Sequence, residues 1–151
     1  ERPRGTEGIG HIWTATSPDL IHWGNHTLIV RGGSQWEWKK IGAGAPPLKT
    51  PKGWLEIYHA VYGITTLEVY GLGALLLDLK NPRKVLGRTR APILYAREPY
   101  ERVGEAPNVV FTSGAILERS GEVKIYYGAC DTVQCVATAR VEDLIHACLR
   151  R

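Results

Sequence analysis

"KKIGAGAPPLKTPKGWLEIYHA", residues Lys39 to Ala60, joins two lysines to an aromatic strand through a segment of Gly, Ala and Pro. Residues 42–45 have little or no side chain, so the backbone can lie close to a ligand or to a neighbouring strand. "KTPKGW" predicts a hairpin turn that returns the next strand alongside the first. We therefore expect Lys40 and His59 at the same place, although a solvated Lys40 and a hydrogen-bonded strand histidine remain the alternative. Pro46 and Pro47 exclude a phosphate-binding P-loop, which would open a helix here.

Short β-strands separated by Gly, Pro and polar turns dominate the rest of the chain. "ERSGE" predicts a second hairpin turn. Helical spacing is confined to "VEDLIHACLR", which begins at Val141. The strands are predicted in "HIWTATS", "HTLIV", "GWLEIYHAV", "GALLLDL", "NVVFTSGAIL", "EVKIYYGA" and "CVATARV". The sequence therefore predicts an all-β fold with a short C-terminal helix.

A weak internal repeat accompanies this pattern. Asp19, Asp78 and Asp143 each follow a strand and precede a leucine, at intervals of roughly sixty residues, which is typical of a β-propeller with long loops. A β-sandwich is the alternative. Three repeats would not close a ring and would leave strand edges exposed. The chain is thus expected to be part of a larger molecule or to assemble with a second copy as a homo-oligomer.

Composition places the chain among globular proteins and excludes several classes of function. Its 151 residues are 44% hydrophobic and 23% charged, without an apolar run of membrane-spanning length. The net charge of +4 is scattered, so no nucleic-acid partner is expected. No signal peptide is recognisable, and a cytoplasmic location is expected. The three cysteines lack metal-ligand spacing, so we expect reduced thiols and no metal.

Asp131 and the aromatic side chains are further candidates for a binding site. Asp131 follows an aromatic strand, where its carboxylate can accept hydrogen bonds from sugar hydroxyls; an Asx-turn is the alternative. Asp19 is expected only to form a turn. Five Trp and seven Tyr suit stacking on sugar faces. Trp36 and Trp38 are the expected pocket residues, whereas the remaining candidates are expected in the core: Trp13, Trp23 and Trp54.

Five motifs in this order carry a resemblance that covers nearly the whole chain: "SPDLIHWGNH", "KIGAGAPPLKT..GWLEIYHAV", "LGALLLDLKNPRKVLGR", "YERVGEAPNVVFTSG" and "YYGACDT..CVATA". They look like the C-terminal part of glycoside hydrolase family 130, the β-mannoside phosphorylases. The resemblance implies a five-bladed β-propeller, of which residues 1–151 would form about three blades as the C-terminal portion of one catalytic domain. It also implies cleavage of β-mannosides by inorganic phosphate, with inversion, to give α-mannose 1-phosphate.

The resemblance also implies roles for individual residues. Lys40 and His59 match phosphate-binding positions, and "ERPR" points to Arg2 as a third, although Glu1 replaces the family's histidine. Tyr58 is expected as a further phosphate contact, and Asp131 matches an aspartate that binds the mannosyl unit. Phosphate enters as a co-substrate, and no cofactor is implied.

The family's general acid, an aspartate in a Glu-Asp-Pro-Arg segment, has no counterpart between Glu1 and Arg151. An inverting mechanism needs this proton donor, so no catalytic residue is predicted in this chain, which is not expected to turn over alone. The alternatives are a β-mannoside hydrolase of the same family and a non-catalytic carbohydrate-binding propeller fragment. No particular acceptor sugar is predicted.

Overall fold

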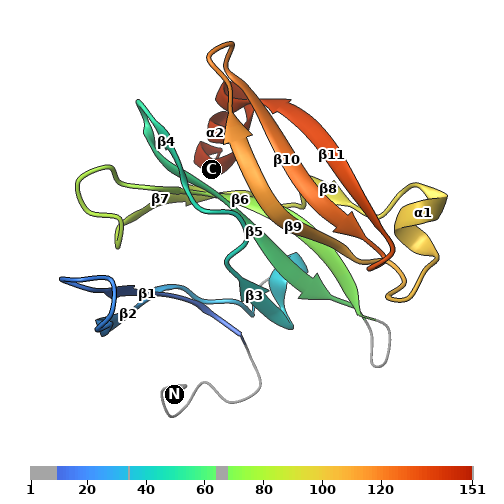
Figure 1. Ribbon diagram of the computed structural model, residues 1–151, viewed down its shortest axis with the longest axis horizontal. Helices are drawn as coiled ribbons and strands as arrows, with labels where there is room; N and C mark the ends of the chain where they lie inside the picture. Colours follow the sequence, from blue (N-terminus) through green and yellow to red (C-terminus); the bar gives the residue numbers. More distant parts are fainter. Residues whose placement is uncertain (1–9, 34, 64–67, 151) are drawn as a thin grey trace.

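The computed structural model describes residues 10–33, 35–63 and 68–150, which form three antiparallel sheets (Figure 1). The first sheet contains two strands, β1 (Ile12–Thr16) and β2 (Gly24–Val30). The second is built on β5 (Gly53–Tyr62) and β6 (Val69–Leu77). The third contains β9 (Val110–Leu117), β10 (Glu122–Ala129) and β11 (Val133–Arg140). The predicted mainly β fold is therefore confirmed.

Interrupted strands flank the central pair β5 and β6 on both sides. Along β5, the short strands β3 (Lys40–Gly42) and β4 (Leu48–Thr50) pair with its two ends, because the Gly-Ala-Pro segment between them leaves the ladder. Along β6, β7 (Val85–Arg88) and β8 (Leu94–Tyr95) do the same. On each side of the central pair, the neighbouring strand is thus divided into two short strands, because the chain leaves the sheet between them.

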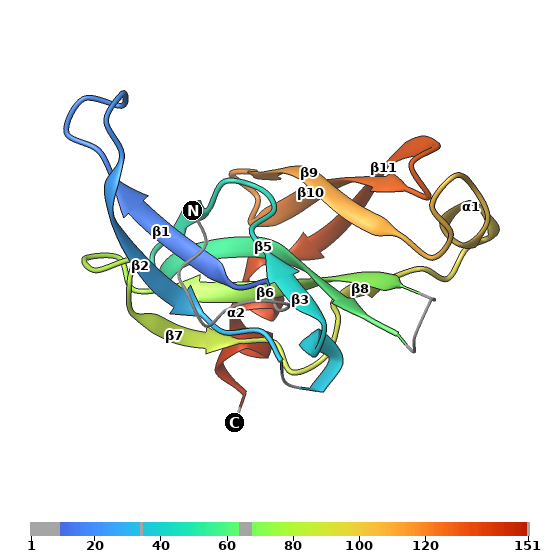
Figure 2. The ribbon, with the colours of Figure 1, turned by 90° about the horizontal axis from the view of Figure 1, so that it is seen from below.

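The central sheet is buried on both faces, which explains the nearly continuous apolar run of β6. One face packs against the third sheet and the C-terminal helix α2 (Val141–Leu149), around Leu55, Ile57 and Leu72. The other face packs against β1 and β2, around Tyr58, Ala60 and Leu75. Helix α2 lies directly on β7, since a Cβ at Gly87 would lie 2.2 Å from the Cys148 carbonyl oxygen. Figure 2 shows the β1–β2 hairpin projecting beyond the central sheet.

The aspartate repeat has a structural basis in two of its three members. Asp19 Oδ1 accepts hydrogen bonds from the backbone N–H groups of Ile21 (2.9 Å) and His22 (2.8 Å). Asp78 Oδ1 accepts from those of Lys80 (2.9 Å) and Asn81 (2.8 Å) in the same way. Each aspartate thereby fixes the turn that joins two strands, as predicted for Asp19. Asp143 instead lies in the first turn of α2.

Most other local predictions are confirmed. The two predicted hairpin turns join β4 to β5 and β9 to β10, and the helix starts at Val141 as expected. The cysteines are free thiols, two of them buried. The sequence did not predict the short strands beside β5 and β6, the 3-10 helix η1 (Gln35–Glu37) or helix α1 (Pro99–Arg102). In the described part of the chain, no helix is long and apolar enough to cross a membrane.

Candidate functional site

A pocket of about 730 Å³ opens where the central and third sheets diverge. Tyr70 of β6 and Phe111 of β9 line it, so both sheets contribute to its wall. The segment between α1 (Pro99–Arg102) and β9, the residue that precedes β6, and the β10–β11 turn also contribute to the wall. The described residues that line it are Glu68, Tyr70, Ala106, Pro107, Val109, Phe111 and Asp131.

Lys40 and His59 come together beside this pocket, as the sequence predicted. Strand β3 pairs with the end of β5, so that Lys40 faces Val61 and Gly42 faces His59. The His59 ring lies on Gly42, where an added Cβ would come within 2.5 Å of the ring. Only glycine allows this approach. The small residues of the Gly-Ala-Pro segment therefore make room for the histidine itself.

Aromatic rings connect these two side chains to the pocket. Phe111 lies 4.4 Å from His59 between ring centroids, and Tyr70 lies 6.2 Å from it. Lys40 Nζ lies 5.2 Å from the centroid of the Tyr70 ring, within the range of a cation–π interaction. Both aromatic rings line the pocket. Lys40 and His59 therefore lie next to the pocket, in contact with the aromatic rings that line it.

His59 has an electrostatic environment that favours its neutral form. Burial first, and then the positive charge of Lys40, lower the pKa of the His59 imidazole, against a hydrogen bond to the backbone of Ala43. Its Nδ1 atom is buried and has no hydrogen-bond partner among the described residues. Hydrogen phosphate carries both an O–H donor and acceptor oxygens, so it can satisfy a ring nitrogen in either protonation state.

Asp131 reaches the pocket through a tight turn between β10 and β11. The turn is closed by the Thr132 N–H, which donates to the Ala129 carbonyl oxygen at 3.0 Å. Both central residues, Cys130 (φ 50°) and Asp131 (φ 53°), are left-handed, as a type I′ turn requires. Aspartate tolerates this conformation better than most residues do. The turn therefore fixes the backbone that carries the Asp131 carboxylate, which lines the pocket.

Tyr58 is not brought to this place. Side chains alternate along a strand, so Tyr58 lies on the face of β5 opposite to His59. Its ring is buried against Gly73, and its hydroxyl donates to Glu37 Oε1. Glu37 Oε2 pairs with Arg88 at 2.9 Å. Tyr58 therefore belongs to an internal polar network rather than to the pocket.

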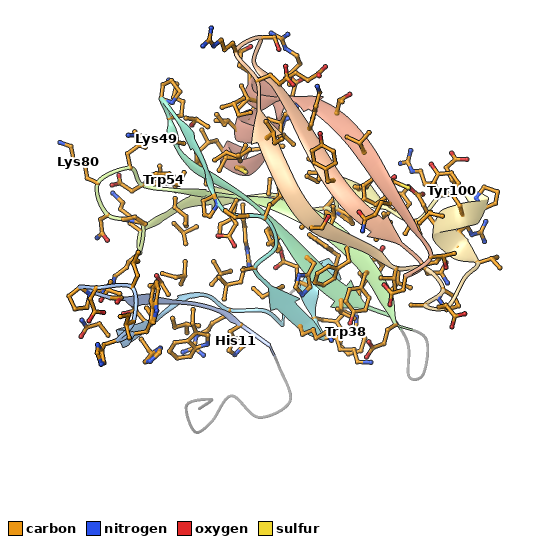
Figure 3. The ribbon with its side chains drawn as sticks, viewed as in Figure 1. His11, Trp38, Lys49, Trp54, Lys80 and Tyr100 are labelled. Carbon is orange, nitrogen blue, oxygen red and sulfur yellow. The ribbon has the colours of Figure 1, made fainter. Side chains whose placement is uncertain are left out.

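The remaining sequence-based candidates have mixed outcomes. Arg2 lies outside the described residues. Trp36 stacks on Tyr58, with 6.1 Å between ring centroids, and so lies on the face away from the pocket. Trp38 is exposed beside β3 and does not line the pocket (Figure 3). Trp23, expected in the core, is 57% exposed near the tip of the β1–β2 hairpin, because the Asp19 turn directs this segment outward.

Among the described residues no cluster of metal-ligating side chains occurs.

Sequence reasoning missed three pocket residues: Glu68, Tyr70 and Phe111. Period-2 alternation places Tyr70 and Leu72 on one face of β6, but it does not show which face meets a cavity. The register that sets Val61 opposite Tyr70 is a pairing of distant segments. A search for aromatic residues at the ends of strands would have found both rings.

The chain was compared with known proteins. The family model described as beta-1,4-mannooligosaccharide phosphorylase matches residues 4–150. A 1,2-beta-oligomannan phosphorylase of Thermoanaerobacter sp. (strain X514) is 42% identical over 88% of this chain and 44% of its own length. A beta-1,4-mannooligosaccharide phosphorylase of Ruminococcus albus is 36% identical over 93% of this chain and 42% of its own. The chain thus spans less than half the length of these relatives.

A solved structure supports the same relationship. The beta-1,2-mannobiose phosphorylase of Listeria innocua, in complex with beta-1,2-mannobiose, superposes with a TM-score of 0.82 at 37% identity. The match covers 90% of this chain and 38% of that one. Sequence, fold and the ordered motifs agree, and the chain belongs to glycoside hydrolase family 130.

Proposed function

We propose that this chain is part of a β-mannoside phosphorylase, which cleaves a β-mannoside with inorganic phosphate and inversion to give α-mannose 1-phosphate. The observation that carries the proposal is the meeting of Lys40 and His59 beside a pocket that Asp131 lines. The relatives described above are named as mannoside phosphorylases, which supports the same assignment.

The geometry suits phosphate as a co-substrate. A phosphate nucleophile carries close to two negative charges, so it needs a fixed cation and hydrogen-bonding groups that aim one oxygen at the reacting carbon. Lys40 would supply the charge, and the His59 imidazole a hydrogen-bonding group near it. We expect no cofactor, because phosphate itself provides the nucleophile.

Asp131 would bind the mannosyl unit. Its carboxylate can accept hydrogen bonds from sugar hydroxyls, while Tyr70 and Phe111 offer ring faces for stacking. Lys40 and His59 border the pocket beside the Tyr70 and Phe111 rings, and Asp131 lines the same pocket. This arrangement would place phosphate and sugar next to each other, as an in-line displacement requires.

The proposed architecture is a part of a five-bladed propeller. Three successive antiparallel sheets pack face to face, and two of them carry the same aspartate turn between neighbouring strands. Such repetition is typical of blades. The outward face of the third sheet bears exposed apolar side chains, as expected of a blade surface that meets another blade: Ile116, Tyr126 and Val136.

The test is phosphate binding by the chain, measured by ³¹P NMR titration. Lys40→Met should weaken binding at least tenfold, since a charge-assisted contact to phosphate is worth about 1.5–3 kcal/mol. Lys52→Met, at an exposed turn residue, is the matched control and should bind as the wild type does. Equal binding by the two variants would refute the phosphate site. In the full-length enzyme, formation of mannose 1-phosphate from a β-mannobiose with phosphate, rather than of free mannose without phosphate, separates the phosphorylase from a hydrolase.

A further inference from the structure

An ion pair stands at the rim of the pocket, directly beside the proposed phosphate site. Lys39 Nζ lies 2.7 Å from Glu68 Oε1, and the Tyr70 hydroxyl donates to Glu68 Oε2 at 3.4 Å. Glu68 lines the pocket, and Lys39 is held by its backbone N–H, which donates to the Val61 carbonyl oxygen at 3.2 Å. Lys39 directly precedes β3, which carries Lys40, and Glu68 directly precedes β6, which pairs with β5.

The charge of Glu68 reaches the phosphate site. The hydrogen bond from Lys39, and then the charges of Lys39 and Lys40, outweigh burial and lower the pKa of the Glu68 carboxyl, so it is ionised at neutral pH. Lys40 Nζ lies over the ring of Tyr70, whose hydroxyl contacts Glu68. Without a partner of its own, this carboxylate would attract Lys40 and repel an incoming anion.

We propose that Lys39 holds Glu68 in a neutralising ion pair, and that this pair sets how strongly Lys40 and His59 bind phosphate. The inference rests on the proposed function, because it concerns the affinity of that site for its co-substrate. Lys39 and Glu68 act here as positioning residues: neither is required to touch phosphate. Their effect on phosphate affinity is electrostatic. It becomes visible when one partner is removed and the charge of the other is no longer neutralised.

Three variants separate this role from a structural one. Lys39→Ala leaves the Glu68 charge uncompensated, so phosphate binding should weaken about fivefold and the pKa of His59 should rise. Glu68→Gln removes the negative charge, so binding should strengthen and the pKa of His59 should fall. The double variant removes both charges and should return both quantities close to their wild-type values. If the pair only stabilised the fold, Glu68→Gln would not restore the phosphate affinity that Lys39→Ala removes.

The chain offers a matched control pair. Lys124 Nζ lies 2.6 Å from Glu118 Oε1 on the third sheet, and the two side chains are 35% and 42% exposed. The corresponding exposures of Lys39 and Glu68 are 32% and 41%. Lys124→Ala and Glu118→Gln should therefore alter stability as the rim variants do, without changing phosphate affinity or the His59 pKa.

The measurements are a ³¹P NMR titration with inorganic phosphate and an NMR titration of the His59 ring. Rescue of Lys39→Ala by Glu68→Gln in both measurements would support the inference. If Lys39→Ala behaves like Lys124→Ala, the inference is wrong. If the wild type and Lys40→Met bind phosphate equally poorly, the proposed function fails. The His59 titration then still shows whether the pair controls the electrostatic field of the site.

Discussion

Tyr58 and His59 are consecutive residues of β5, yet they lie in opposite kinds of environment. Tyr58 is buried on one face, where its hydroxyl, Glu37 and Arg88 satisfy one another. His59 lies on the other face beside Lys40, with a buried ring nitrogen that has no partner among the described residues. We call the face of Tyr58 closed, because its hydroxyl is paired within the protein, and the face of His59 open, because it borders the pocket.

The closed face also supports the open one. Glu37 belongs to η1, which directly precedes the segment that carries Lys39 and Lys40. The contacts of its carboxylate with Tyr58 and Arg88 therefore hold the start of β3 on the central sheet. The contacts of Glu37 on one face of β5 thus help to hold Lys40 in place on the other face.

The largest expected effect is on the closed face. Arg88→Met removes the ion partner of the buried Glu37 carboxylate and should lower the free energy of unfolding by about 3 kcal/mol, because breaking a buried pair costs about 3–5 kcal/mol and Arg88 keeps partial exposure. Urea denaturation measures this change. Arg83→Met, at an exposed turn residue, should change stability by less than about 0.5 kcal/mol. Equal effects of the two substitutions would contradict the comparison.

The second prediction concerns pH. Burial raises the pKa of the Glu56 carboxyl from 4.5 to about 7, so the folded protein binds a proton more tightly than the unfolded chain does. The stabilisation is complete below pH 4.5 and is lost as the pH rises through about 7, by about 3 kcal/mol.

Glu56→Gln should remove most of this pH dependence and raise stability at neutral pH, as measured by urea denaturation between pH 5 and 8. Glu37, whose pKa burial also raises, contributes in the same direction in both proteins. On the open face, the lowered pKa of His59 has the opposite effect on the pH dependence of stability. The contribution of His59 is complete above pH 6.5 and is lost as the pH falls below 6.5. An unchanged slope in Glu56→Gln would show that this carboxyl is not desolvated.

Tyr58→Phe tests whether the two faces are separable. Without the hydroxyl, Glu37 loses a buried donor, and stability should fall by about 1–2 kcal/mol. Phosphate affinity should stay within about twofold, because Tyr58 does not face the pocket. Tyr126→Phe, at an exposed position, is the control for loss of a hydroxyl. A large loss of phosphate binding with unchanged stability would restore the role expected for Tyr58 from the sequence.

The smallest effect on stability is expected at His59 itself. His59→Gln should weaken phosphate binding about tenfold in the ³¹P titration, which corresponds to about 1.4 kcal/mol. Unfolding free energy should change by less than about 1 kcal/mol, since the ring already carries an unsatisfied nitrogen. His26→Gln on the exposed β2 strand is the control. A larger loss of stability than of affinity would place His59 among the structural residues.

Local sequence signals predicted much of this fold. Turn residues predicted both hairpins, and apolar spacing predicted α2, because these depend on neighbouring residues alone. The convergence of Lys40 and His59 was predictable for the same reason: one hairpin separates them. Asp131 was predictable from its place after an aromatic strand.

Long-range packing was not predictable. Tyr58 was expected at the phosphate site because it adjoins His59, but strand alternation turns it to the opposite face. The ring contacts of Phe111 depend on how two sheets pack across segments far apart in sequence. Trp36 and Trp38 precede Lys40 in the chain, and that proximity did not indicate where their side chains lie.

The left-handed turn at Cys130 and Asp131 has a consequence for the timing of recognition. Its backbone is confined to a sparsely populated conformation when the protein folds, so the loss of freedom is complete before any ligand arrives. A ligand that meets the Asp131 carboxylate therefore orders little of the chain around it. The entropic cost of ordering this turn is thus met during folding, and only the ligand and the Asp131 side chain remain to be ordered on binding.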